Sequence, residues 1–238
     1  MPVRAAQDVA TADALYRDRA NIASARKAAD LWAAELTRSS SPEETHRGEV
    51  APGENFDAAW KLARVDYWLG GHAPEHERRK FLENGMEAAR RAIALRPNRP
   101  EGHFWLAADM GTLAESFGLR QGLKYRKVIK AELETTLRLD PAFMEGSADR
   151  ALGRYYFKVP GLFGGSNKEA EAHLRASLKY NPNSTASHFF LAEVLLDAGR
   201  KEEGRTELQR VLDAPHDPDW IPEDNEFKEQ ARARLAKR

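Results

Sequence analysis

Two groups of residues in this sequence have the types and the spacing for chemistry. The first is a histidine pair, His72 and His76, which has the four-residue spacing of a zinc-binding pair on a helix. Pro74 lies between the two and argues against one continuous helix. The chain has no cysteine, and no third ligand accompanies the pair, so we expect a loop here and no metal site.

The second group is the glycine-rich segment 158–170, KVPGLFGGSNKEA. Its spacing does not fit a phosphate-binding P-loop, which needs Gly, four residues, then Gly-Lys-Ser/Thr after a strand. A turn between two helices fits better, with Ser166 or Asn167 capping a helix that begins near Lys168. A turn alone leaves Leu162 and Phe163 unexplained. We expect these two to present apolar surface to a cavity mouth or to a neighbouring subunit.

Other signs of catalysis are missing from the sequence. No activated nucleophile, oxyanion loop or paired carboxylate motif stands out, so we expect no catalytic residues, no cofactor and no enzymatic activity. The 37 basic residues balance the 37 acidic residues, which gives no general attraction to nucleic acid. No apolar run approaches the roughly 18 residues that span a bilayer.

The elements that position these residues are repeated amphipathic helices. Segments such as AARRAIALRP and EAHLRASLKYNP each end in a proline, at Pro97, Pro141, Pro182 and Pro215, so that the stops recur every 33 to 44 residues. Proline removes a backbone donor and disfavours helix at the residue before it. The pattern predicts an all-α array of helix pairs.

The repeats resemble the tetratricopeptide repeat (TPR), a helix hairpin of about 34 residues. The family has a small, a large and a small residue at steps of four and three in each second helix, ahead of the proline, and the resemblance rests on the matching positions: Gly85, Ala89, Ala92; Ile129, Leu133, Thr136; Ala170, Leu174, Ser177; and Gly204, Leu208, Val211. Small residues let two helices approach closely. We expect one helical-repeat domain, a TPR-like solenoid over 1–238, with approximate units 9–42, 55–97, 100–141, 146–182 and 185–215.

Three segments exceed the TPR length and are expected to be loop insertions on one face: GGHAPEHERR (70–79), GTLAESFGLRQGLK (111–124) and the glycine-rich segment. Insertions in solenoids often serve binding. The last segment, 223–236, carries Phe227, Ala231 and Leu235 at four-residue spacing. It is expected to be a capping helix that docks on Leu208 and Val211.

A closer resemblance covers 146–235, and more weakly 9–145. VPGLFGG, HFFLAEVLLDAGR and APHDPDWIPED resemble the T component of tripartite ATP-independent periplasmic (TRAP) transporters. The resemblance implies a periplasmic homotrimer beside a solute-binding subunit, with a cavity for an apolar or amphipathic small molecule. The start, MPVRAAQDVA, lacks the apolar core of a secretion signal. A periplasmic location therefore implies a removed leader, whereas a native Met1 implies the cytoplasm.

The TPR resemblance also selects the residues of the inner face. Its ligand or groove set is Trp68, Phe104, Arg150, Arg154, Phe157, Lys158, Phe189, Glu193 and Leu196, to which we add Leu162 and Phe163. Arg150, Arg154 and Lys158 form a cationic stripe that either binds an anionic ligand or pairs with Glu193 and Asp197 of the next unit. The aromatic residues either contact ligand or pack in the core. The alternative to small-molecule binding is a TPR scaffold that holds a partner's peptide in its groove.

Overall fold

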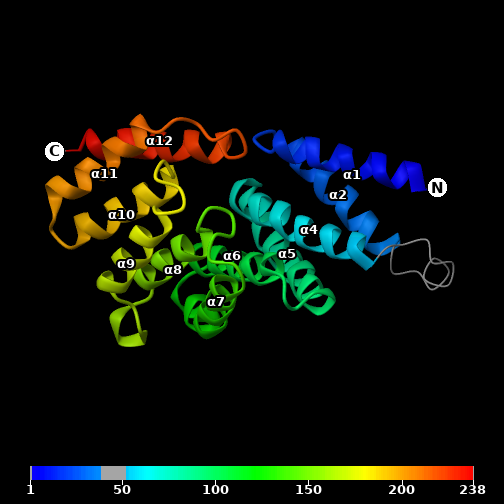
Figure 1. Cartoon of the computed structure of the whole chain (residues 1–238), viewed down its shortest axis with the longest axis horizontal. Coiled ribbons are helices and arrows are strands. Elements are labelled where there is room, and N and C mark those ends of the chain that lie inside the picture. Colours follow the sequence, from blue (N-terminus) through cyan, green and yellow to red (C-terminus); the bar gives the residue numbers. More distant parts are fainter. Residues whose placement is uncertain (1, 39–51, 238) are drawn as a thin grey trace. The chain divides into compact units, whose positions relative to one another are not determined.

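A computed structural model describes residues 2–38 and 52–237, and it contains only helices and turns in these two ranges (Figure 1). Successive helices form antiparallel pairs joined by short turns. The all-helical, TPR-like fold class is thereby confirmed. The helices are α1 (Pro2–Arg17), α2 (Ile22–Arg38), α4 (Pro52–His72), α5 (Glu75–Leu95), α6 (Pro100–Ser116), α7 (Leu119–Leu139), α8 (Ser147–Lys158), the 3-10 turn η1 (Gly161–Phe163), α9 (Asn167–Ser177), α10 (Thr185–Asp197), α11 (Lys201–Asp213) and α12 (Ile221–Leu235).

Each predicted repeat unit corresponds to one helix pair, from α1/α2 to α10/α11, and α12 follows the last pair. Residues 39–42 of the first unit lie outside the described residues. The chain divides into two compact units, residues 1–135 (unit 1) and 136–238 (unit 2), and the division falls inside α7. The expectation of one continuous domain stays a prediction.

The prolines mark the ends of the second helices, as expected. α5, α7 and α11 each end two residues before their proline, at Leu95, Leu139 and Asp213. α9 ends earlier, at Ser177, and a turn leads on to Pro182. At its other end, the Ser166 hydroxyl accepts a hydrogen bond of 3.2 Å from the Glu169 N–H, which confirms Ser166 as the helix cap.

Small residues hold the paired helices close together. A Cβ atom added to Gly153 of α8 would lie 2.5 Å from Leu174 Cγ of α9, and one added to Gly204 of α11 would lie 2.6 Å from Leu196 Cγ of α10. Real Cβ atoms do not approach side chains this closely, so the helix spacing depends on glycine at both positions. The small and large residues of the TPR pattern are buried in all four units.

Two of the three expected loop insertions are helical instead. The residues of GGHAPEHERR extend α4 to His72 and start α5 at Glu75, so only Ala73 and Pro74 separate the two helices. GTLAESFGLRQGLK likewise extends α6 and α7 on either side of a two-residue turn. Extra residues that carry helical periodicity continue the backbone hydrogen bonds, which a loop would leave unmade. Only the third insertion forms a loop, around η1.

In two of the repeats, a histidine joins the helix pair to the connection that precedes it. In α6, His103 Nδ1 lies 2.5 Å from Glu132 Oε2 of α7, and Nε2 lies 2.9 Å from the Pro97 carbonyl oxygen. In α10, His188 repeats both contacts, at 2.6 Å to Glu207 and 2.8 Å to the Pro182 carbonyl. Each imidazole therefore ties two helices of its pair to the preceding turn.

The C-terminal helix caps the last repeat, as the sequence predicts. Ala231 of α12 is fully buried in one cluster with Leu208 and Val211 of α11, and Phe227 and Leu235 pack against it. Two polar contacts of the first half of α12 add to this interface. The Thr185 hydroxyl donates to the buried Asp224 carboxylate over 2.5 Å, and the Lys228 ammonium donates to the Leu212 and Ala214 carbonyls at the end of α11.

Candidate functional site

Nine of the predicted site residues lie in unit 2, where an ion network connects three of its helices. The Glu193 carboxylate of α10 accepts hydrogen bonds from the guanidinium groups of Arg154 of α8 and Arg234 of α12. Arg154 lies over the Phe190 ring and Arg234 over the Phe189 ring, at 4.6 and 5.0 Å. The internal pairing of the cationic stripe with Glu193 is thus present, and Arg234 is a partner that the sequence gave no reason to expect.

The other residues of the cationic stripe, and its second expected partner, Asp197, have different contacts. Asp197 accepts from Asn167 over 2.7 Å rather than from a stripe cation. Arg150 also has a partner in the fold. Lys158 is exposed, with its ammonium 5.3 Å from the Phe157 ring centroid.

The aromatic and aliphatic members of the predicted set pack against other helices. Phe189 is buried in the cluster under α12, and Leu196 packs against the same cluster. Phe157 packs against the cluster between α9 and α10. In unit 1, the Trp68 indole N–H donates to the Arg19 carbonyl over 2.7 Å and its ring stacks on His72. Phe104 of unit 1 is also buried. A ligand role for these residues stays a prediction.

The hairpin around η1 presents apolar surface on a fixed backbone. Leu162 is 89% exposed and Phe163 38% exposed. Gly164 has a φ of 103°, which favours glycine. The Ser166 N–H donates to the Tyr156 carbonyl over 2.9 Å and the Gly165 N–H to the Pro160 carbonyl over 3.2 Å. The loop is therefore held by hydrogen bonds while Leu162 stands in solvent and Phe163 is partly exposed.

A pocket of about 510 Å³ opens between α5, α6 and α7 in unit 1. We call it the α5–α7 pocket. Small-molecule sites have volumes of roughly 300 to 1,000 Å³. Apart from the adjacent pair Lys124 and Tyr125, its lining residues are three or four positions apart on each helix, which places them on one face: Arg90 and Ile93; Leu106 and Met110; Lys124, Tyr125, Val128 and Glu132.

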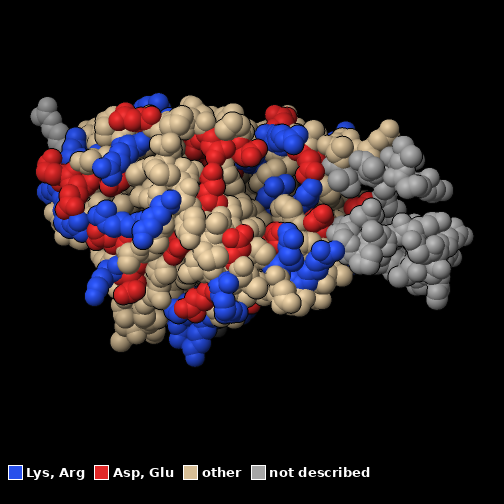
Figure 2. All heavy atoms as spheres, in the orientation of Figure 1, with Lys and Arg blue, Asp and Glu red and all other residues tan. Residues whose placement is uncertain are grey.

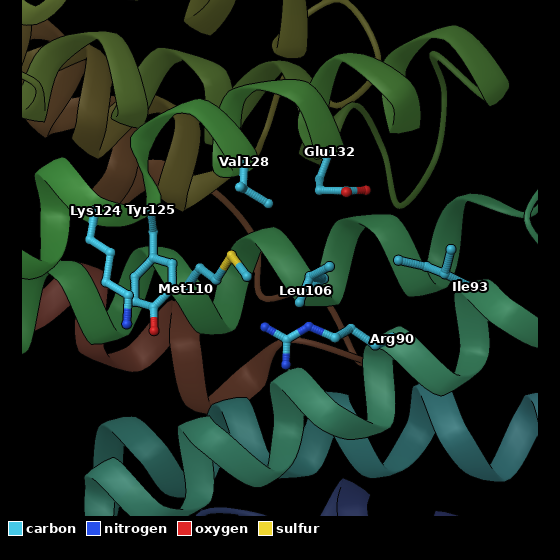
Figure 3. A pocket seen from close by; sticks show the side chains of 8 residues that line it. All are labelled: Arg90, Ile93, Leu106, Met110, Lys124, Tyr125, Val128 and Glu132. Atoms are coloured by element: carbon cyan, nitrogen blue, oxygen red, sulfur yellow. The ribbon is translucent and has the colours of Figure 1, made fainter.

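Polar and apolar groups are separated within this pocket (Figure 3). Lys124 and Tyr125 extend from α7 toward α5 at one end, and the Arg90 guanidinium extends from α5 toward the same end. Leu106 and Met110 of α6, both nearly fully buried, form the apolar floor beside them. Ile93 and Glu132 lie toward the other end. The Glu132 carboxylate is held by His103 at 2.5 Å.

The one carboxylate that lines this pocket in the described part of the chain, Glu132, is bound to His103 and not to either cation. Within residues 2–38 and 52–237, neither Arg90 nor Lys124 forms an ion pair, and the Tyr125 hydroxyl makes no hydrogen bond. The sequence reasoning missed this pocket because it considered the first helices of each repeat, whereas six of the lining residues belong to second helices. The available signal was the second insertion, since Lys124 is its last residue.

Unit 1 also buries two carboxyl groups at a helix contact. Asp109 of α6 is fully buried, and neither of its oxygens has a hydrogen-bond partner in the described residues. Burial raises the pKa of Asp109 well above its usual range, and the nearby Asp66 carboxyl of α4 raises it further. Burial likewise raises the pKa of Asp66, with a contribution from Asp30. A Cβ atom on Gly85 would lie 2.5 Å from Asp109 Oδ2, so this glycine makes the room for the carboxyl group.

Histidine and acidic residues do not gather into a metal site in the described ranges, where no three of them are placed to hold an ion. His72 ends α4 with Nδ1 2.7 Å from the Trp68 carbonyl oxygen, and His76 lies in the first turn of α5. None of the described helices is long and apolar enough to cross a bilayer. Basic and acidic side chains are intermixed over the face in view in Figure 2.

Comparison with known proteins identifies the family. The family model of the TRAP transporter T-component matches residues 101–234, and that of regulator of microtubule dynamics protein 1-3 matches residues 9–163. Each match covers more than half of the chain. The chain belongs to both families. The two matches share residues 101–163, which hold α6, α7, α8 and η1.

The individual relatives agree with the match to regulator of microtubule dynamics protein 1-3. Regulator of microtubule dynamics protein 3 of Rattus norvegicus is 26% identical over 163 residues, and that of Xenopus laevis 27% identical over 161 residues. These stretches cover 68% and 67% of this chain but only 34% and 33% of the relatives, so the chain spans about a third of their length. A crystal structure of a thermophilic TPR protein from Thermus thermophilus superposes with a TM-score of 0.67 at 20% identity, covering 97% of this chain and 98% of that one. This likeness shows the TPR-type fold.

Proposed function

We propose that this chain is a non-enzymatic accessory of a TRAP-type uptake system that binds an apolar or amphipathic small molecule. The observation that carries the proposal is the match to the T-component family over residues 101–234. The α5–α7 pocket supports the small-molecule part, because its volume of about 510 Å³ and mixed lining suit such a ligand. The partner in this proposal is the solute-binding subunit of the transporter, and the location is the periplasm.

The proposal includes a homotrimer. Leu162 at 89% exposure and Phe163 at 38% place apolar surface on a hydrogen-bonded loop, where an interface with a second copy would remove it from water. Phe189 and Glu193, by contrast, lie against α12 of the same chain. The groove of the last repeat is therefore a weaker candidate for the ligand than the α5–α7 pocket.

A second candidate is a TPR scaffold that binds a partner's peptide. It is supported by the match to the regulator of microtubule dynamics family over residues 9–163, since the curated relatives are named as regulators of a cytoskeletal polymer. Only about a third of those relatives is represented here. A scaffold would bind an extended peptide and need no small molecule.

One pair of measurements separates the two functions. The full chain, purified without detergent, is examined by native mass spectrometry for a retained small molecule and for subunit number, and by biolayer interferometry for binding to a TRAP solute-binding subunit. A periplasmic binding protein of another transporter class is the control. The accessory function predicts selective binding to the TRAP subunit by a trimer with bound ligand. Equal binding to both proteins, or to neither, contradicts it.

A further inference from the structure

We infer that the α5–α7 pocket is a binding site for a monoanionic amphiphile, a carboxylate with a medium-length acyl chain. The inference rests on the proposed small-molecule role and deepens it, because it assigns a site that differs from the inner groove and names the ligand class. The carboxylate head lies at the end formed by Arg90, Lys124 and Tyr125. The acyl chain lies over Leu106 and Met110.

Charge complementarity fixes the sign of the head group. Arg90 and Lys124 come from different helices, extend toward the same end of the pocket (Figure 3), and form no ion pair in the ranges that the structure describes. The Tyr125 hydroxyl at this end is a further donor. Arg and Lys side chains carry donors and no acceptors, so this end offers hydrogen bonds to an anion and repels a cation.

The apolar floor of the pocket determines that the rest of the ligand is an apolar chain. Leu106 and Met110 are nearly fully buried, and Val128 stands 40% exposed on the α7 side. An acyl chain laid along this floor removes its own apolar surface and that of Val128 from water. Methionine adapts its shape to such a chain because its side chain is unbranched and flexible.

Glu132 limits the ligand to one charge. Its carboxylate lies at the opposite end of the pocket from Lys124, and His103 holds it in place at 2.5 Å. Residues 124 and 132 are separated along α7 by about 12 Å at 1.5 Å per residue. A ligand with a second carboxylate at that distance meets Glu132 and is repelled. The far end of a medium-chain monocarboxylate is an uncharged methyl group, which Glu132 does not repel.

The test uses the full chain and four defined probes. Decanoate is titrated calorimetrically below its micellar concentration, alongside octanoate, decylamine and decanedioate. We expect decanoate to bind, octanoate to bind about tenfold more weakly because two buried methylene groups are lost, and decylamine and decanedioate to bind at least about tenfold more weakly than decanoate.

A matched pair of variants locates the head group. Arg90→Gln with Lys124→Gln removes two charges from α5 and α7 inside the pocket, and Lys80→Gln with Lys127→Gln removes two exposed charges from the same helices outside it. The first should weaken decanoate binding by at least about tenfold, while the second leaves it unchanged. All four positions are exposed, so both variants should fold.

Several results would overturn the inference: no decanoate binding, equal binding of decylamine, or equal loss in the two double variants. A chain that binds the TRAP subunit and retains a small molecule, yet shows any of these results, keeps the proposed function and loses this site. A chain that binds decanoate as described but ignores the TRAP subunit keeps the site and loses the accessory function.

Discussion

Replacing Asp109 by asparagine should make the stability of the protein less dependent on pH. Asp109 is fully buried in unit 1 and both of its oxygens lack hydrogen-bond partners in the described residues. Burial, followed by the neighbouring Asp66 carboxyl, raises the pKa of Asp109. The folded state therefore keeps this proton at pH values where the unfolded chain has released it.

The sign of the effect follows from proton linkage. Below the ordinary Asp pKa of about 3.9 both states are protonated, and the stability associated with the neutral carboxyl is fully present. As pH rises from there toward the raised folded pKa, the unfolded state loses its proton first. The free energy of unfolding then falls by up to about 1.4 kcal/mol per pH unit for each such carboxyl. The Asp109→Asn variant loses this contribution and keeps that of Asp66, whose raised pKa is caused first by its own burial.

The difference in unfolding free energy between the wild type and Asp109→Asn separates the titration of Asp109 from the other effects of the substitution. Burying the asparagine amide without partners costs about 1 to 3 kcal/mol, but this cost does not change with pH. Relative to the wild type, the variant should therefore gain stability as the pH rises through the range in which only the unfolded chain releases the Asp109 proton, by at most about 1.4 kcal/mol per pH unit.

Urea unfolding measured at half-unit steps between about pH 4.5 and pH 8 tests this, since the midpoint and slope give the unfolding free energy at each pH. Glu202→Gln, which neutralises an exposed carboxylate on α11, is the control and should leave the pH profile close to that of the wild type. A constant difference between wild type and Asp109→Asn across the series would refute the argument that Asp109 is protonated in the core.

Three further perturbations test the packing. Gly85→Ala should destabilise the protein by about 1 to 3 kcal/mol through overpacking, and the loss should largely disappear in an Asp109→Ala background; additive effects in this double-mutant cycle would mean that the two residues do not meet. Deleting residues 220–238 should expose the apolar cluster under α12 and cause dye binding or aggregation, whereas a soluble truncation with an unchanged melting temperature would contradict the capping role. Leu162→Ser with Phe163→Ser should leave the circular dichroism spectrum unchanged but weaken the proposed self-association in sedimentation experiments; the same self-association as in the wild type would leave the hairpin as a turn only.

Features that depend on local rules were predictable from the sequence. Proline at Pro97, Pro141 and Pro215 ends each second helix within two residues, because its missing N–H and its ring act on the adjacent backbone alone. The small residues of the repeat pattern are buried for a similarly direct reason, since their spacing places them on one helix face. The cap helix was predictable because its apolar stripe has the period of a helix and follows the last repeat.

The two long insertions show where the local rules were read too simply. An excess over the TPR length was taken for loops, yet those residues lengthen α4, α5, α6 and α7. The length of an insertion gives the number of added residues, but it does not tell whether they form a loop or extend a helix. The helical continuation is favoured because it keeps the backbone hydrogen bonds within the helix.

Which helix faces meet was decided by the tertiary structure. Arg234 reaches Glu193 across 41 positions in the sequence, and Asp66 of α4 influences Asp109 of α6. The α5–α7 pocket is lined by residues of three helices. Helical spacing places Arg90, Met110 and Lys124 on faces of three helices, and only the packing of those helices brings the faces around one space. Periodicity is set within a single helix by 3.6 residues per turn, whereas the neighbours of a face depend on the separations and angles at which whole helices pack.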